Sequence, residues 1–434
     1  MSTLKPLHIG MTLAPTWLNG AGWRRPDSQV EGIFSAAFHV DIARRAEAAK
    51  LDFVFRPDTL FLNTPALEQG SAFAALDPTV LLTAVAQETT RIGLLSTMST
   101  TFYPPYVVAR QIQSLNWLSN GRAGWNIVTA LEGHANFGLA SMPSADERYA
   151  QAAEFTDVVR ALWGSYPRSA LLTDRATGRH GDPARVHPID HEGRFFQVKG
   201  PLNLPAFSDA PIPLVQAGAS PAGRAFAASV ADAVFISAPD REAALEVRSD
   251  LRRRAEAAGR KAGDIRILPG LSLYLAPSRA EAQALFAETH AGADIARKLA
   301  IICEMTGLDL SDWPDDRPIS ATDLPPPPER VRSRTHSDLL RRAILRETPT
   351  RADLFLRPEV AGSGHWQIIG TVEDALAEIR AWAEAGAIDG FIATPGGSVD
   401  CMHLVLDDLV PRLTEAGLFR KDYTGTTFFE HLQG

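Results

Sequence analysis

The chain has 434 residues, of which 45% are hydrophobic and 22% are charged, and its formal net charge is −8. This composition is typical of a globular protein with a large core, and it excludes the basic surface of a nucleic-acid-binding protein. The two cysteines, Cys303 and Cys401, are far apart and give no basis for a disulfide framework, which fits a reducing compartment.

The sequence shows no sign of export or membrane insertion. Its first residues, MSTLKPLHIGMTLAP, lack a basic segment followed by an apolar signal core. No stretch reaches the roughly 20 apolar residues that a membrane span needs. We therefore expect a soluble, cytoplasmic protein.

Short apolar segments alternate with helical patterns along the chain. Buried strands are expected at Leu7–Leu13, Leu51–Phe55, Arg91–Ser96, Arg122–Val128, Ile212–Gln216, Ala233–Ile236, Ile265–Leu275 and Ile388–Ile392. Helices are expected at Phe38–Lys50, Ala74–Glu88, from Pro104 onward, and at Asp146–Trp163, Pro221–Val230, Arg241–Ala258, Ser278–His290 and Thr371–Glu384. Strands without polar alternation are buried on both faces, so the pattern predicts an α/β fold with about eight parallel strand–helix units.

Two segments interrupt this alternation. Residues 166–205 are rich in Gly, Pro and His, and residues 305–365 are polar and contain the proline run Pro325–Pro328, which is expected to be extended. An α/β barrel carries its long insertions in the loops where active sites lie. We therefore expect one domain, 1–434, with two insertions that are candidates for an active-site lid.

Several common catalytic motifs are missing. The sequence contains no Gly-x-Gly-x-x-Gly after a strand, no P-loop, no His-Glu-x-x-His and no Gly-x-Ser-x-Gly. His180, His187 and His191 share one insertion, but their spacing fits no standard zinc site, and no metal is predicted. These absences favour chemistry that is carried by an organic cofactor.

Polar residues stand where the predicted strands end. Asp58 follows the second strand, Thr97 the third, and Asn126 interrupts the apolar fourth strand. A buried Asn needs hydrogen-bond partners, which a ligand could supply. Each residue also has an ordinary structural explanation, because Asp58 could cap a turn and Thr97 could bind neighbouring backbone.

The segment Gly218-Ala219-Ser220 lies between the fifth strand and the next helix. A helix N-terminus offers free N–H groups and a partial positive charge, Gly218 lets an anion approach the backbone, and Ser220 adds a hydroxyl. The segment is therefore a candidate phosphate site, although a simple strand–helix turn with Ser220 as the N-cap fits as well.

At this point the residues resemble a known family. The blocks concerned are, in chain order, GMTLAPTWLNGAGWRRPDS, RAEAAKLDFVFRPDTLF, STMSTTFYPPYVVARQ, LSNGRAGWNIVTA, DERYAQAAEF, HEGRFFQVKGPLNLP, PLVQAGASPAGRAFA and AGLFRKDYTGTTFFEHL. They are similar to the bacterial-luciferase-like monooxygenases that use reduced FMN. The branch they resemble contains nitrilotriacetate, EDTA, dibenzothiophene-sulfone and long-chain alkane monooxygenases.

The resemblance implies a TIM (β/α)8 barrel, a homodimer or dimer of dimers, and FMNH₂ supplied by a separate NAD(P)H-dependent flavin reductase. It implies oxygenation of a small organic substrate by O₂ through a flavin C4a-(hydro)peroxide, with C–N or C–S cleavage as one outcome and hydroxylation or N-oxidation without cleavage as the other. The FMN-binding positions that it implies here are Asp58, Thr97, Asn126, Tyr149, Gly218, Ala219 and Ser220.

The chain departs from the family pattern at two places. Many relatives carry His where this chain has Ala145 and Arg25, so no catalytic side chain is carried over, and the roles of His134 and His365 stay open. Arg24 and Arg25 could meet an acidic substrate or be paired within their loop. Two alternatives are a coenzyme F420-dependent oxidoreductase on the same fold and a flavin-storage protein.

Overall fold

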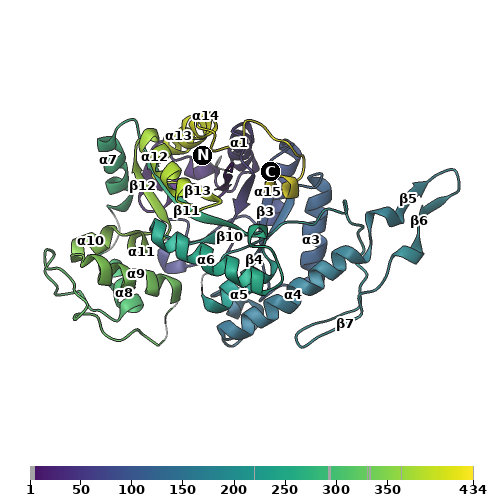
Figure 1. Ribbon diagram of the computed structural model, residues 1–434, viewed down its shortest axis with the longest axis horizontal. Helices are drawn as coiled ribbons and strands as arrows, with labels where there is room; N and C mark the ends of the chain where they lie inside the picture. The colour runs from purple at the N-terminus through teal and green to yellow at the C-terminus, as the bar shows by residue number, and fades with distance from the viewer. Residues whose placement is uncertain are drawn as a thin grey trace.

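The computed structural model describes residues 5–218, 220–291, 295–329, 331, 334–362 and 364–433. Within these ranges, parallel strands close into an eight-stranded ring (Figure 1): β1 (His8–Thr12), β2 (Phe53–Arg56), β3 (Gly93–Ser99), β4 (Ala123–Val128), β9 (Leu214–Gln216), β10 (Ala233–Ile236), β11 (Arg266–Leu275) and β13 (Gly390–Pro395). The ring closes because β1 pairs with β13 and β10 pairs with β11. Each of the eight predicted strands overlaps one of these, and the prediction of a TIM barrel is confirmed.

Helices pack around the outside of the ring (Figure 1). They are α1 (Ala36–Ala48), α2 (Pro78–Glu88), α3 (Pro105–Leu118), α4 (Ala145–Ser165), α5 (Pro221–Val230), α6 (Arg241–Ala257), α7 (Arg279–His290), α12 (Val372–Glu384), α13 (Val399–Leu404) and α14 (Val410–Glu415). The last helix, α15 (Phe428–Gln433), lies at one end of the ring instead. Side-chain caps set several of their starts, as where Ser220 accepts a hydrogen bond from the Gly223 N–H. No helix in the described part of the chain is both long and apolar enough to cross a bilayer.

The half of the barrel interior near the amino-terminal ends of the strands is filled by apolar side chains. One of these side chains comes from the last helix. Phe428 of α15 is fully buried and its ring lies 5.2 Å from the ring of Phe53. A methyl group on Gly93 would come within 2.6 Å of the Phe428 ring, so glycine there leaves room for this aromatic plug. The helix α15 therefore closes the amino-terminal end of the barrel.

The first insertion forms two short hairpins that project from the barrel (Figure 1). They are β5 (Leu171–Asp174) with β6 (Arg179–Gly181), and β7 (His191–Glu192) with β8 (Gln197–Val198). The second hairpin is anchored by Glu154 of α4, whose carboxylate accepts hydrogen bonds from the Phe195 and Phe196 N–H groups and pairs with His191 at 3.1 Å.

The second insertion and the segment just before it contain helices that the sequence did not predict. They are α8 (Ile295–Thr306), α9 (Arg334–Glu347), α10 (Arg351–Leu356) and α11 (Pro358–Ala361), and they enclose a separate apolar cluster that includes Leu340 and Ile344. A further unpredicted strand, β12 (Trp366–Gly370), pairs with the upper half of β11, where β10 has already ended. The division of the chain into one domain, 1–434, with insertions at 166–205 and 305–365, stays a prediction.

We expect Phe428→Ala to lower the free energy of unfolding by about 3–5 kcal/mol, because it empties space in a closed interior that cannot collapse. Chemical denaturation would measure this loss. The neighbouring Phe429, which is only half-buried, provides the control, and its replacement by Ala should cost clearly less. Equal losses for the two variants would contradict the plug.

Candidate functional site

The predicted site residues lie along one side of the carboxyl-terminal end of the barrel. Thr97 of β3 is in register with Asn126 of β4, and Asn126 is in register with Val215 of β9. Asp58 follows β2, which pairs with β3, and Gly218 follows β9. The structure therefore places these residues on four adjacent strand ends, which we call the polar rim.

At the centre of the polar rim, Thr97 fixes the orientation of Asn126. The Thr97 hydroxyl donates its proton to the Arg56 carbonyl at 2.6 Å, so its oxygen can only accept from Asn126. The group that faces it at 3.0 Å must then be the Asn126 amide nitrogen, Nδ2. The other end, Oδ1, is buried and has no hydrogen-bond partner among the described residues. The rim thus presents an oriented acceptor that lacks a donor.

At one end of the polar rim, Tyr149 of α4 reaches the start of α5. A methyl group on Gly218 would lie 3.0 Å from the Tyr149 hydroxyl oxygen, and one on Gly223 would lie 2.6 Å from it. Because the Ser220 oxygen accepts the Gly223 N–H at 3.1 Å, its own proton remains available to a ligand. Tyr149, Gly218 and Ser220 thus share one place, whereas Ala219 lies outside the described residues.

Gln216, which was not among the predicted FMN-binding positions, joins this end of the rim. It is 1% exposed, and its Oε1 atom has no hydrogen-bond partner among the described residues. Its amide would lie only 2.5 Å from a methyl group on Gly218, so it borders the same loop. The signal in the sequence was a polar residue that ends the apolar strand Leu214–Gln216.

At the other end of the rim, Asp58 is a partly buried carboxyl group. Burial and, to a smaller extent, the nearby charge of Asp77 raise its pKa to about 6, against the opposing effects of a hydrogen bond from the Thr59 N–H and of the Arg56 charge. Asp58 and Thr97 line a cavity of about 180 Å³ whose outer wall is apolar, formed by residues that include Leu60, Phe61, Phe73 and Leu131. This acid therefore titrates near neutral pH at the edge of a pocket.

The loops around this cavity expose an unusual amount of apolar surface. Two loops border the cavity, one after β2 and one after β4. The Asn136 side chain of the second loop donates a hydrogen bond to the Leu60 carbonyl of the first at 2.9 Å. Within the first loop, the rings of Phe61 and Phe73 pack with their centroids 5.6 Å apart. Exposed side chains of these loops include Leu62, Leu67, Phe73, Leu131, Phe137 and Leu139. Apolar patches of this kind mark binding surfaces rather than ordinary protein surface.

Comparison with known proteins identifies the architecture. Residues 18–388 match the luciferase-like monooxygenase family. The chain is 34% identical to N-acetyl-S-(2-succino)cysteine monooxygenase of Bacillus subtilis, over 99% of this chain and 97% of that protein. It is 33% identical to nitrilotriacetate monooxygenase component A of Aminobacter aminovorans, over 100% and 97%. The chain belongs to the luciferase-like monooxygenase family. The predicted resemblance and the prediction of a flavin-dependent monooxygenase are confirmed.

A solved structure supports the same conclusion at the level of the fold. The chain is similar to riboflavin lyase, whose structure holds modified FMN and riboflavin, with 30% identity and a TM-score of 0.81 over 99% of this chain and 96% of that one. Flavin is therefore the cofactor class of this family. The polar rim is the part of the structure to compare with what a flavin requires.

Among the described residues, Arg25 and His191 are already paired, whereas His134 is not. Arg25 contacts Asp27 at 3.1 Å and Glu288 at 3.4 Å, so the loop explanation accounts for it better than an acidic substrate does. His191 is paired with Glu154 at 3.1 Å in the projecting insertion. His134 lies in a short helical turn, and its buried Nδ1 has no partner among the described residues.

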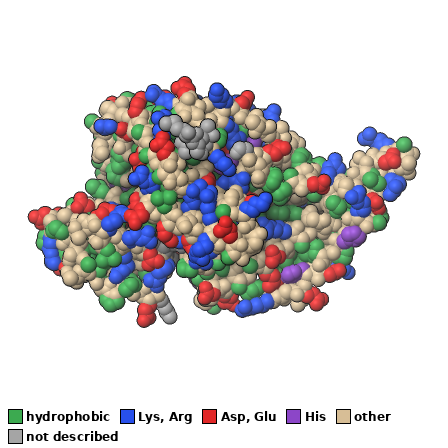
Figure 2. All heavy atoms as spheres, viewed as in Figure 1, with side chains coloured by type: hydrophobic (Ala, Val, Ile, Leu, Met, Phe, Trp, Pro, Cys, Tyr) green, Lys and Arg blue, Asp and Glu red, His purple; other side chains and the backbone are tan. Residues whose placement is uncertain are grey.

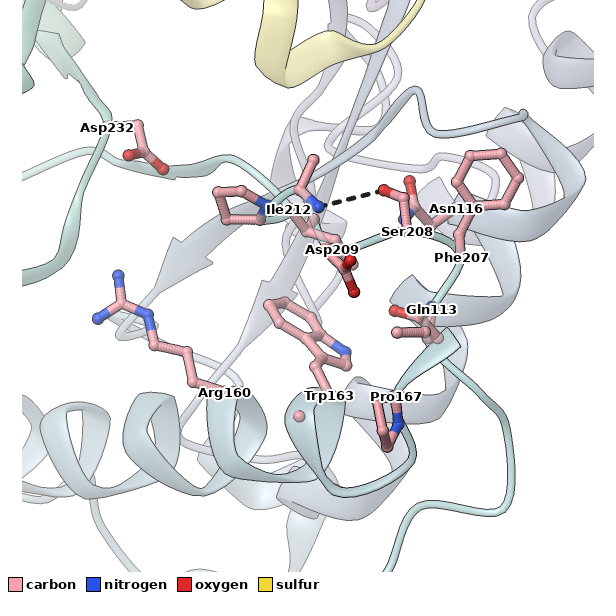
Figure 3. A pocket seen from close by; sticks show the side chains of 14 residues that line it. Gln113, Asn116, Arg160, Trp163, Pro167, Phe207, Ser208, Asp209, Ile212 and Asp232 are labelled. Carbon is pink, nitrogen blue, oxygen red and sulfur yellow. Dashed lines mark hydrogen bonds between the residues drawn. The ribbon is translucent and has the colours of Figure 1, made fainter. Parts of the chain in front are cut away.

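A second cavity, of about 370 Å³, opens at the opposite end of the barrel (Figure 3). Arg160 and Trp163 reach it from α4, and Asp232 borders it where β10 begins. Arg160 and Asp232 each bind backbone there, at the Val230 carbonyl and the Leu214 N–H. Since this end of a TIM barrel serves stability, we assign the cavity no part in catalysis.

We expect Asp58→Asn to stabilise the fold at pH 7.5 by about 1 kcal/mol, after allowance for solvent screening. The folded-state pKa of about 6 lies above the ordinary 3.8, so the contribution of Asp58 to stability is present below pH 4 and is lost as pH rises through 6. Thermal unfolding at pH 7.5 and pH 4 measures this, and the exposed Asp312→Asn is the control. A gain that is equally large at pH 4 would contradict the assignment.

Proposed function

We propose that the chain is the oxygenase component of a two-component system that uses FMNH₂ and O₂ to oxygenate a small organic substrate. A separate NAD(P)H-dependent flavin reductase supplies FMNH₂, and the oxygenase works as a homodimer or dimer of dimers. When bound, reduced FMN supplies the chemistry that activates oxygen. The remainder of the proposal concerns what the residues of the chain do.

The observation that carries the proposal is the unpartnered acceptor of Asn126. A buried acceptor without a donor costs about 1–3 kcal/mol, so a ligand N–H is the expected partner. A flavin ring presents such N–H groups at its edge. Thr97 holds the Asn126 amide in the orientation that leaves Oδ1 available, and therefore acts through Asn126.

The phosphate of FMN fits the other end of the rim. The start of α5 offers the Ala222 N–H and the positive end of the helix dipole, because Pro221 has no N–H and the Gly223 N–H is bound by Ser220. Ser220 and Tyr149 add hydroxyl donors, and Gly218 leaves the backbone open to close approach. The proposed FMN residues are Asp58, Thr97, Asn126, Tyr149, Gly218, Ala219 and Ser220, to which we add Gln216.

The apolar cavity wall supports an organic substrate and the exclusion of water. Leu60, Phe61, Phe73 and Leu131 lie beside Asp58 and Thr97, where a substrate could approach the flavin ring. A dry site protects an activated oxygen species from unproductive decay. We favour cleavage of a C–N or C–S bond, because the relatives named above are a nitrilotriacetate and a succinocysteine monooxygenase. Hydroxylation or N-oxidation without cleavage is the alternative outcome.

We expect Ser220→Ala to weaken FMNH₂ binding by about 1–2 kcal/mol, the worth of one hydrogen bond to a charged group. Anaerobic titration of FMNH₂, followed by protein fluorescence, measures the affinity. Ser278→Ala is the matched control, because Ser278 caps α7 by the same contact but lies outside the candidate site. Equal affinity in the wild type and Ser220→Ala would remove the phosphate assignment.

The reaction itself is tested with ¹⁸O₂. The protein is combined with FMN, a flavin reductase and NADH, and a panel of thioethers, sulfones and tertiary amines is offered. We expect mass spectrometry to find one ¹⁸O atom in the product formed from an accepted substrate. Substrate reduction or oxidation without label, while FMNH₂ binds normally, would replace the monooxygenase proposal with hydride transfer.

A further inference from the structure

One titratable side chain at the carboxyl-terminal end of the barrel has no role in the site described above. His365 lies between the helices of the second insertion and β12, and its ring contacts Phe235 of β10 with the ring centroids 5.1 Å apart. A methyl group on Gly270 of β11 would lie 2.8 Å from both Cγ and Nδ1 of His365. The imidazole therefore rests directly on the inner surface of β11, where only glycine leaves room for it.

Phe235 connects His365 to the aromatic contacts inside the barrel. Phe235 reaches across the barrel and contacts Phe55 of β2 at 5.9 Å, although β2 and β10 lie on opposite sides of the ring. These two rings form an aromatic floor above the apolar interior. Thr97 and Asn126 belong to β3 and β4, whereas His365 contacts β10 and β11 on the other side of the ring. An eight-stranded barrel is only wide enough for side chains to meet across it, so a ligand on the floor borders both sides.

The hydrogen-bonding state of His365 suits contact with a ligand. No hydrogen bond joins either ring nitrogen to a described residue, and the side chain is largely but not fully buried. Burial, with a smaller contribution from the nearby charge of His336, lowers the pKa of His365 to about 4. At neutral pH the ring is thus uncharged and presents one N–H donor and one acceptor nitrogen.

We propose that His365 is a flavin-contacting residue, which hydrogen bonds through an imidazole nitrogen to the FMN ring system from the side of the barrel opposite Asn126. This proposal rests on the proposed function, because it assumes that the flavin ring lies on the aromatic floor. It adds a contact from the second insertion, so flavin binding involves both the barrel strands and the segment that leads out of helices α8–α11.

The first test follows the histidine ring directly. The protein has 11 histidines, and selective ¹⁵N-histidine labelling with a His365→Gln spectrum assigns the His365 signals. We expect anaerobic addition of FMNH₂ to the full chain to move the His365 ring-nitrogen signals, while those of His180, on the projecting hairpin, stay in place. Quenching of protein fluorescence in the same samples reports FMNH₂ binding independently. Binding without movement of the His365 signals overturns this inference alone, whereas no binding overturns the proposed function.

Variants supply a second readout. His365→Phe keeps the ring packing on Phe235 but removes the hydrogen bond, and it should weaken FMN and FMNH₂ binding by about fivefold. His365→Gln keeps a donor and an acceptor and should restore much of the affinity. His180→Phe controls for the loss of a histidine in general. Equal affinities for wild type and His365→Phe would overturn the inference, as would a His365→Gln variant that binds no better than His365→Phe.

Discussion

The contact between Phe55 and Phe235 divides the molecule into two parts with different physical demands. These rings come from opposite sides of the barrel and meet over its axis. Below them the interior is closed and apolar, and it ends at Phe428 of α15. Above them the strand ends carry polar side chains and the insertions enter. The apolar part below the two rings therefore stabilises the fold. The part above them contains buried polar groups that do not stabilise it. The charges on the surface, by contrast, are mixed in sign and define no such division on the face seen in Figure 2.

The polar groups above the floor differ in whether the protein satisfies them. Thr394 of β13 donates to the Leu271 carbonyl at 3.0 Å, and Thr97 donates to the Arg56 carbonyl, so both are accounted for by the fold. The acceptors of Asn126 and Gln216 are buried without a described partner. An unsatisfied buried group weakens the fold, and its presence beside satisfied neighbours therefore points to a ligand. Asp58 is a similar case, because its raised pKa means that its charged form destabilises the fold at a place where a ligand is expected to bind.

The sequence predicted the barrel well because its strands are short, apolar and separated by capped helices, all of which are local signals. It missed β12 because a five-residue strand next to a polar insertion has little local signature. It missed α9, in which Leu340 and Ile344 pack on other insertion helices while Leu339 packs on the main core. Asn126 was identifiable because it interrupts an apolar strand. The orientation of its amide was not, since it depends on Thr97 of a neighbouring strand. The position of His365 depends on Gly270, which is 95 residues away in sequence and whose meaning appears only when β11 and β12 lie together.

The pairing of β1 with β13 has a consequence for how the chain is made. The Thr12 hydroxyl meets the Ala393 carbonyl across a separation of 381 residues, so the ring cannot close until nearly all of that length has left the ribosome. At about 5–20 residues per second, the first strand waits tens of seconds for its neighbour. Throughout that interval the growing sheet has open edges, which are sites of aggregation. Molecular chaperones that shield nascent chains are therefore the cellular factors on which the yield of this barrel should depend most.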